Sequence, residues 1–321
     1  AYSLDELKRR GLFGREGLAF TVQDLAENRL FGREGLAYEA EELGAHGWVP
    51  HGVYALTPDE LSYQGLKRLG KNDQGYEEYE DVKTGIVLIR VLAAEFQMGS
   101  NDGRDDEKPV HKVKLSEYLI GKYEVTNAQY RAFCRATQHE EPLQPPDGWG
   151  YAKYFSDVQY NDYPVVGVSW EDAKAFCEWA GMKLPTEAEW EYAAKGEEAR
   201  AYPWGKEEPD GTRANYSKEL KGGDYTRKVG SYLKGVSSFG ALDMAGNVWE
   251  WCWDWYGEKY YDECKDGKQD PPGPPGGSSR VVRGGSWYHI VRDLRASFRN
   301  KSGPGYTYYG NGFRVARGFP P

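Results

Sequence analysis

Short apolar runs separated by long polar stretches form the dominant pattern of this chain. The run 85–91 (GIVLIRV) is apolar at nearly every position and predicts a buried strand. In 110–115 (VHKVKL), apolar and basic residues alternate, which is typical of a strand with one face in water. Beyond Gly196 we expect only short strands, because glycine, aromatic and polar residues prevail there.

Three segments show the spacing of apolar positions that marks amphipathic helices. The first begins near Thr126 or Asn127, and the second begins at Ser169 and ends at Gly181. The third begins at the capping box 186–189 (TEAE) and ends at Gly196. We expect the apolar stripes of these helices to face the core, and they comprise Tyr130, Phe133, Cys134, Ala173, Phe176, Cys177, Ala180, Trp190, Ala193 and Ala194.

Residues 1 to about 70 contain an internal repeat. The sequence FGREGLA occurs at 13–19 and again at 31–37, an offset of 31 − 13 = 18, and acidic-Leu pairs follow the same register. Each unit predicts a short helix closed by a glycine turn, and units this short must stack to bury a face. We expect a small N-terminal helical repeat region with a linker over 1–75, acting as a structural cap or as a docking or oligomerisation segment. Residues 76–321 would form the second domain.

Composition indicates a folded chain despite its low hydropathy. Only 39% of the residues are hydrophobic, but 15% are aromatic, including 11 Trp and 25 Tyr, and disordered chains are poor in aromatics. The net charge of −9 argues against a nucleic-acid partner, which needs a basic face. No stretch is long and apolar enough to span a bilayer. The location stays open between the cytoplasm and, if a leader before Ala1 is removed, the cell surface.

The sequence gives no positive sign of catalytic chemistry. The cysteines are too few for a disulfide framework in a chain this long, and we expect buried, reduced thiols, with the state of the last two left open: Cys134, Cys177, Cys252 and Cys264. The histidines lack metal-ligand spacing: His46, His51, His111, His139 and His289. A phosphate-binding glycine loop and a nucleophile elbow are also absent from the sequence.

Eight motifs in order carry a resemblance to a known family. They are Phe96–Ser100, Glu124–Asn127, Pro164–Trp170, Leu184–Glu191, Tyr202–Gly205, Gly246–Trp251, Arg283–Trp287 and Gly312–Arg314. Together they resemble the formylglycine-generating-enzyme (sulfatase-modifying-factor) family over residues 80 to 318. The resemblance implies an α+β, loop-rich, C-type-lectin-like fold. Most of its tryptophans are expected to pack the core.

The resemblance also implies structural calcium. By position, Asp243 and Glu250 would supply side-chain oxygens to the ion, and Gly246 and Val248 would supply carbonyls. The alternative is that both carboxylates cap turns. A second family site matches less well, because the loop that would carry it is shorter here; its candidates are Asn215, Tyr216, Asp224 and Tyr225.

Active members of the resembled family bind copper(I) through a cysteine pair that follows the Gly-Gly-Ser motif. Soft thiolates suit copper(I), but here the segment 284–295 contains no cysteine, and the first expected position falls at or near His289. Oxidation of a sulfatase cysteine by that mechanism is therefore not expected. A divergent oxidase with an unrecognised metal site stays as an alternative.

A set of residues near the C-terminus falls where relatives often carry asparagine, and each residue type is reached from the codon AAC by changing adenines alone. The set comprises Tyr288, His289, Ile290, Asp293, Phe298, Ser302, Gly303, Gly305, Tyr306, Tyr308, Tyr309 and Gly310. It lies between the scaffold motifs 283–287 and 312–316. This pattern resembles the variable proteins of diversity-generating retroelements.

Tyrosine-rich loops spaced by glycine and serine are typical of antibody paratopes. We therefore predict a non-catalytic protein that binds a protein or other macromolecular ligand through this surface. Two alternatives are that the tyrosines cover the fold's own loops, and that the N-terminal repeats recruit a structural or signalling partner. The neighbouring arginines are expected to pair with acidic residues and orient loops: Arg292, Arg295, Arg299 and Arg314.

Overall fold

The computed structural model describes residues 65–145, 153–198, 200–217, 225–264 and 266–318. The chain divides into two units, residues 1–68 and 69–321, and the expected N-terminal repeats lie outside the described residues. The division into domains at residue 75 stays a prediction. Of the helices described, none combines the length and the apolar character needed to cross a membrane.

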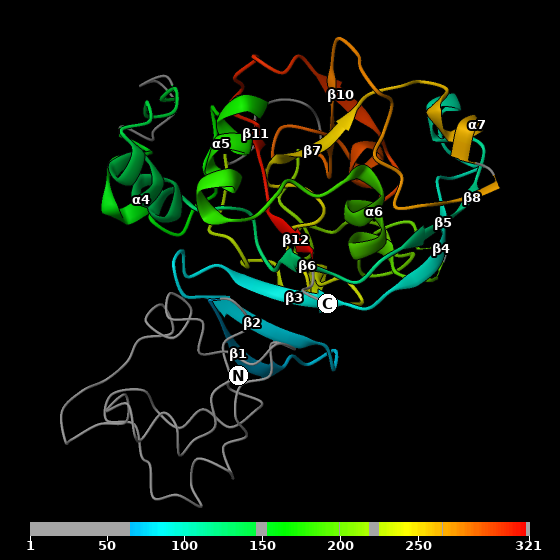
Figure 1. Cartoon of the computed structure of the whole chain (residues 1–321), viewed down its shortest axis with the longest axis horizontal. Coiled ribbons are helices and arrows are strands. Elements are labelled where there is room, and N and C mark those ends of the chain that lie inside the picture. Colours follow the sequence, from blue (N-terminus) through cyan, green and yellow to red (C-terminus); the bar gives the residue numbers. More distant parts are fainter. Residues whose placement is uncertain (1–64, 146–152, 199, 218–224, 265, 319–321) are drawn as a thin grey trace, which may run out of the picture. The chain divides into compact units, whose positions relative to one another are not determined.

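The described residues form three sheets (Figure 1). The first has five strands in the order β1-β2-β3-β6-β12, and its pairs from β2 to β12 are antiparallel. Pairing of β12 with β6 joins one of the last segments of the chain to the early strands. The strand bounds are Leu66–Lys71 (β1), Glu77–Asp81 (β2), Val87–Val91 (β3), Tyr118–Gly121 (β6) and Ala316–Gly318 (β12).

The second sheet has the order β10-β9-β7-β11 and the third the order β4-β5-β8. Two pairs are parallel, β7 with β11 and β5 with β8, so distant segments complete both sheets. The bounds in the second sheet are Trp249–Trp255 (β7), Arg280–Arg283 (β9), Asn300–Ser302 (β10) and Asn311–Gly312 (β11). Those in the third are Ala94–Met98 (β4), His111–Leu115 (β5) and Asp266–Gln269 (β8).

The three expected helices are confirmed, with their caps. In each one the N-cap hydroxyl accepts a hydrogen bond from the third helical amide: Thr126 for α4, Ser169 for α5 and Thr186 for α6. Gly181 ends α5 with a φ of 71°, a left-handed conformation that glycine adopts without strain. The α-helices are Asn127–Thr137 (α4), Trp170–Ala180 (α5), Glu187–Lys195 (α6) and Tyr260–Cys264 (α7), and the 3₁₀ turns are Asp105–Glu107, Val158–Tyr160, Leu233–Gly235 and Val291–Leu294.

The expected strands at 85–91 and 110–115 are confirmed as β3 and β5. The polar sequence at 71–79 (KNDQGYEEY) is typical of a linker, but in the structure it contains the end of β1, a turn and the start of β2. Asn72 organises this turn, since its side-chain oxygen accepts hydrogen bonds from the Gln74 and Tyr76 amides. Its amide group also donates to the Phe239 carbonyl at 2.9 Å, which anchors the hairpin.

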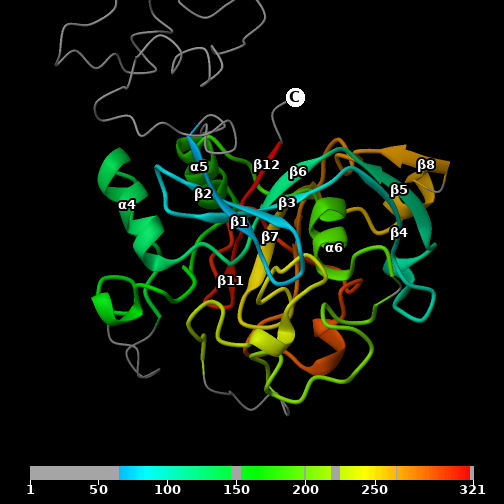
Figure 2. The same ribbon diagram turned by 90° about the horizontal axis from the view of Figure 1, so that it is seen from below.

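The main core surrounds α6, which packs against strands of both the second and third sheets (Figures 1 and 2). Trp190 of α6 is fully buried in a hydrophobic core cluster. The other members of this cluster include residues of α6 and of the strands β3, β4, β5, β6, β7 and β9. Most motif tryptophans are buried as expected, whereas Trp204 is half-buried and stacks on Tyr202. All four cysteines are free and buried.

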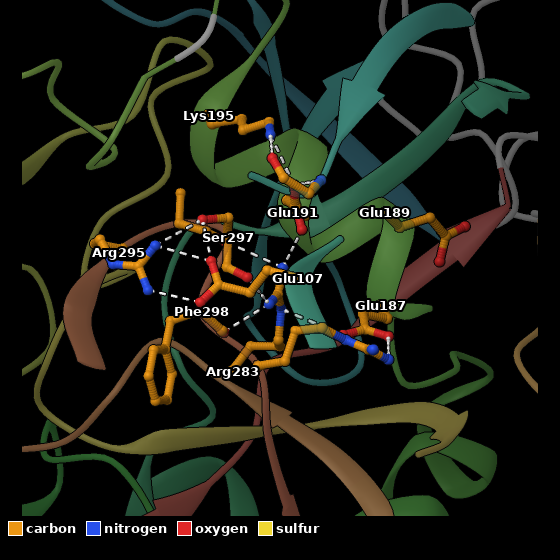
Figure 3. A network of polar contacts seen from close by, with 12 residues as sticks. Glu107, Glu187, Glu189, Glu191, Lys195, Arg283, Arg295, Ser297 and Phe298 are labelled. Carbon is orange, nitrogen blue, oxygen red and sulfur yellow. Dashed lines mark hydrogen bonds and ion pairs between the residues drawn. The ribbon is translucent and has the colours of Figure 1, made fainter. Parts of the chain in front are cut away.

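Helix α6 also brings carboxylates into this core, where buried arginines meet them. Arg283, at the end of β9, pairs with Glu191, and Arg299 holds both oxygens of Glu187 at 2.7 and 2.8 Å. Both arginines are fully buried. Figure 3 shows Glu191 between Lys195 and Arg283, with Glu107 facing Arg295 nearby.

These pairs hold the chain between the two candidate ligand segments, 288–293 and 302–310. Arg283 donates to the carbonyls of Ala296, Ser297 and Phe298, at 3.0, 2.9 and 2.6 Å. Burial alone would raise the pKa of Glu191, but Lys195 and Arg283 outweigh burial and lower it to about 2. The carboxylate is therefore ionised and holds both cations in place.

Replacing Arg283 should destabilise the fold strongly. R283M leaves Glu191 buried with only Lys195 and removes the donor from three carbonyls, so we expect a loss of about 3–5 kcal/mol in the free energy of unfolding. The double variant R283M/E191Q should recover part of the loss. Urea denaturation followed by tryptophan fluorescence measures both, with R200M as the control because Arg200 pairs only with the exposed Glu198. Equal stability of R283M and R200M would contradict this assignment.

Candidate functional site

The C-terminal loops lie over the second sheet and are fixed to it through the backbone. Gly310 accepts a hydrogen bond from the Trp249 amide at 2.7 Å, beside the short parallel pairing of β11 with β7. The Trp287 indole donates to the Tyr309 carbonyl at 3.3 Å, and the Trp170 amide donates to the Pro304 carbonyl at 2.9 Å. The segment 304–310 is therefore tied at both ends to scaffold residues.

Three tyrosines gather on these loops, and we call Tyr288, Tyr306 and Tyr308 the tyrosine surface. Tyr306 is 58% exposed and Tyr288 36%. The rings of Tyr306 and Tyr308 are nearly parallel, at 16°, with centroids 6.4 Å apart. Partial burial raises the pKa of Tyr308, and Tyr288 and Tyr306 add to this effect. The indole of Trp287, which precedes Tyr288, donates to the Tyr309 carbonyl at 3.3 Å and so joins the two loops. Two separate loops thus form one aromatic surface.

Gly310 is buried next to Tyr308, so a side chain at this position would clash with the ring of Tyr308. A Cβ at Gly310 would stand 2.5 Å from Tyr308 Cε1 and 3.2 Å from Ser286 Oγ. Gly310 was expected to contribute to ligand contact, but it is buried and supports the ring of Tyr308 instead.

The structure also removes two other candidates from the exposed surface. Phe298 is 3% exposed and packs beside Trp249 and under the guanidinium of Arg295. Asp293 is 5% exposed and pairs with Arg292 at 3.0 Å. Their backbone turns inward towards the second sheet, which a linear sequence pattern does not reveal. Among the other candidates, Gly305 is exposed and the remainder are half-buried: Ile290, Ser302, Gly303 and Tyr309.

His289 occupies the inner edge of the site. Its Nδ1 lies 3.2 Å from the Trp249 indole nitrogen and 2.7 Å from Ser286 Oγ. The same indole nitrogen lies 3.4 Å from Nε2. Because an indole N–H can only donate, this contact suits a neutral imidazole, which keeps one acceptor nitrogen. Burial lowers the pKa of His289, and the nearby Arg292 lowers it further while Asp293 partly opposes the shift. At the position near which the family's first cysteine falls, this chain holds a neutral ring packed edge-on against Trp249.

Asn247, which the sequence did not single out, links the loops beneath the tyrosine surface. Its side-chain oxygen accepts from the Arg227 amide at 2.8 Å, and its amide group donates to Glu124 at 2.8 Å. Its carbonyl accepts from the Trp287 amide at 2.9 Å. The φ of Asn247 is 62°, a conformation that asparagine tolerates better than most residues. The feature of the sequence that could have pointed to Asn247 is its position inside the motif 246–251.

The calcium candidates Asp243, Gly246 and Val248 lie in the turn leading into β7, and Glu250 lies at the start of β7. Glu250 already has partners. Its two carboxylate oxygens accept from Nε and Nη2 of Arg314, each at 2.6 Å, and one also accepts from the Trp190 indole. Asp243 accepts from the Gly230 amide, and burial raises its pKa to about 6. The described residues contain no group of three or more acidic, histidine or cysteine side chains arranged to hold a metal. Glu250 does not fit the role of a calcium ligand here, and calcium binding stays a prediction.

The second set of calcium candidates is only partly described. Asn215 donates to the Tyr225 carbonyl at 2.9 Å, and the Tyr216 hydroxyl donates to the Pro209 carbonyl at 2.8 Å. Tyr225 packs edge-on against Trp287. Asp224 lies outside the described residues.

The expectation that four arginines pair with acidic neighbours is confirmed. The pairs are Arg292–Asp293, Arg295–Glu107, Arg299–Glu187 and Arg314–Glu250. Arg299 and Arg314 are fully buried and also donate to backbone carbonyls of distant loops. They therefore act on the frame beneath the loops.

Comparison with known proteins identifies the family. The family model for the sulfatase-modifying factor enzyme 1-like domain matches residues 77–319, so the chain belongs to this family. The formylglycine-generating enzyme of Streptomyces coelicolor is 34% identical over 283 residues, covering 71% of this chain and 88% of the enzyme. The serine/threonine-protein kinase pkn1 of Chlamydia pneumoniae is 37% identical over 252 residues, covering 74% of this chain. The chain spans only 38% of that kinase's length.

Solved structures agree on the fold, which is the C-type-lectin-like fold of formylglycine-generating enzymes, α+β and rich in loops. PvdO from Pseudomonas aeruginosa superposes with a TM-score of 0.63 at 27% identity, covering 75% of this chain and 97% of PvdO. Treponema denticola variable protein 1 superposes with a TM-score of 0.57 at 27% identity, covering 73% of this chain and 95% of that protein.

The pairing of Glu250 with Arg314 and the calcium site implied by the sequence resemblance make opposite predictions for thermal stability, and the pairing predicts no effect of calcium. A ligand that binds the native state raises the melting temperature, but Glu250 already directs both oxygens at Arg314. We expect equal melting temperatures, measured by calorimetry, for chelator-treated protein with and without added calcium. A rise that is lost in D243N would show instead that the ion takes Glu250 from Arg314, as the sequence resemblance implied.

The neutral state of His289 should make stability pH-dependent. Its pKa is lowered in the folded protein, so the unfolded chain takes up the proton first as the pH falls through 6.5, its ordinary value. Native stability should therefore decline below that pH, by about 1.4 kcal/mol per unit by which the pKa is lowered. Urea denaturation at pH 8 and pH 5 should show a larger loss for the wild type than for H289Q, in which the other histidines are unchanged. Equal losses would mean that His289 is not held neutral.

Proposed function

We propose that this protein is a non-catalytic ligand-binding member of its family, with the tyrosine surface as its binding site. The observation that carries the proposal is that Tyr288, Tyr306 and Tyr308, two of them exposed, lie on two loops that are joined to each other and tied to a buried frame. Large aromatic rings that are already held in place lose little entropy on binding. Each hydroxyl supplies one polar contact.

Support also comes from what lies behind the surface. His289 packs edge-on against Trp249 at the inner edge, so aromatic rings also lie behind the surface. The segment 284–295 has no thiolate to hold copper(I). The similarity to Treponema denticola variable protein 1 supports the idea that the loops vary while the frame is kept. The ligand on this proposal is a protein or another macromolecule.

Removing the exposed rings should abolish most binding without unfolding the protein. Random 12-residue peptides displayed on phage can be selected on the wild-type protein, and the enriched sequences synthesised as probes. We expect Y288A and Y306A each to weaken peptide binding by about tenfold, because interface tyrosines commonly contribute more than 1 kcal/mol. Biolayer interferometry measures the affinities.

The control is L233A, since Leu233 is 72% exposed and lies outside the C-terminal loops. It should bind the peptides as the wild type does. The proposal fails if selection returns no binder, or if the double variant Y288A/Y306A binds the selected peptides with wild-type affinity. Circular dichroism of each variant confirms that the fold is retained.

A further inference from the structure

One hollow of the described structure shares no residue with the tyrosine surface. Its volume is about 420 Å³, within the range of pockets that take small ligands. It is lined by the turn between β5 and β6, the start of α6, β7, the chain after β8 and the end of β12, including Tyr118, Lys183, Glu189, Trp253, Asp270 and Pro272. Elements from all three sheets therefore meet around it.

Trp253 supplies an aromatic wall that is open to solvent. It is 38% exposed, whereas the four β7 residues before it are buried. Its ring packs against Trp170, with centroids 5.4 Å apart, and its amide donates to the Pro185 carbonyl at 2.9 Å. The indole is thus held in place before any ligand arrives. The guanidinium of Arg280 lies 5.9 Å from its centroid and is itself sandwiched at 3.6 Å by Trp170 and Trp255, which leaves the solvent-open part of Trp253 for a second cation.

The charges around the hollow are unbalanced. Three lining residues carry carboxylates and only Lys183 is basic. Lys183 pairs with Glu189 at 2.6 Å, and Glu117 pairs with Arg90. Asp270 accepts hydrogen bonds from the Ser116 amide and hydroxyl, both at 2.7 Å, and no ion pair joins it to a cation of the described residues.

We propose that this hollow binds a small organic cation with a planar or apolar body, the guanidinium group being its best match. The cation stacks on Trp253 and directs its N–H groups at Asp270 and Glu189. Guanidinium is planar and weakly hydrated, so it combines stacking with hydrogen bonding to carboxylates. The acidic balance of the whole chain, −9, favours the same sign of ligand.

The test uses n-butylguanidinium as the probe and n-butylurea, which is neutral and nearly the same shape, as its matched control. Protein labelled with ¹⁵N-tryptophan gives one side-chain signal for each indole, and W253F identifies that of Trp253. We expect the Trp253 signal to shift in a saturable way with butylguanidinium, to shift far less with butylurea, and to lose the shift at high salt.

Three variants are expected to change the affinity for butylguanidinium, two lowering it and one raising it. A purely structural role of these residues would not produce changes in opposite directions. D270N keeps one acceptor oxygen for the Ser116 amide, gives up the one that accepts from Ser116 Oγ and Gln269, and suits the left-handed backbone at this position, where φ is 41°. E189Q keeps the capping box of α6, which glutamine also satisfies. Both should weaken butylguanidinium binding by roughly two- to fivefold, the range expected for a partly exposed charge pair.

K183Q removes the competing ammonium and should strengthen binding by roughly twofold or more. E258Q, an exposed charge that does not line the hollow, should change nothing. The proposal is overturned if butylurea binds as well as butylguanidinium, if the Trp253 signal does not move, or if K183Q weakens binding as D270N does. None of these outcomes bears on the tyrosine surface, so the two proposals stand or fall separately.

Discussion

The pairing of buried arginines with carboxylates is the interaction on which the rest of this structure depends. Arg283, Arg299 and Arg314 have no exposed surface, and each meets a glutamate on α6 or β7. Taking a charge out of water is costly unless it is paired and its remaining donors are satisfied. Arg299 and Arg314 also donate to backbone carbonyls of loops that are far away in the chain. Arg283 does so through its terminal nitrogens, whereas its Nε has no hydrogen-bond partner among the described residues and lies 3.8 Å from Glu187. Loops that lack strands and helices are therefore held by side chains.

This arrangement separates a fixed interior from a free surface. Arg283 holds the carbonyls of residues 296–298, and Asn247 ties the 124, 227 and 287 segments together beneath the tyrosine surface. Because the backbone is anchored from below, the outward side chains are not needed to hold the loops. Tyr288 and Tyr306 can then change identity at little cost to the fold. Such a division suits a family whose members share a frame and differ in what their loops do.

Sequence patterns located the loops better than the individual contact residues. Tyr288 and Tyr306 are exposed, as a ligand surface needs, but Phe298 and Asp293 from the same set are buried. The C-terminal loops that carry these residues are rich in glycine and polar residues. Their apolar positions follow no regular period, so the sequence does not show which side chains point outward. The roles of the acidic residues in the motifs were even harder to predict from the sequence. Glu250 looks like a cation ligand in the sequence, yet in the fold it is the partner of Arg314, which follows it by 64 positions.

The sequence by itself determined the helices α4, α5 and α6 with their caps, the strands β3 and β5, and the family. Those features follow from neighbours a few residues apart, whose propensities and hydrogen bonds act locally. Only the tertiary structure decided which carboxylates meet which arginines, that Asn247 joins three loops, and that Trp253 and Asp270 line one hollow. Such contacts join residues that are distant along the chain, and no local pattern specifies the distance between them until the chain has folded.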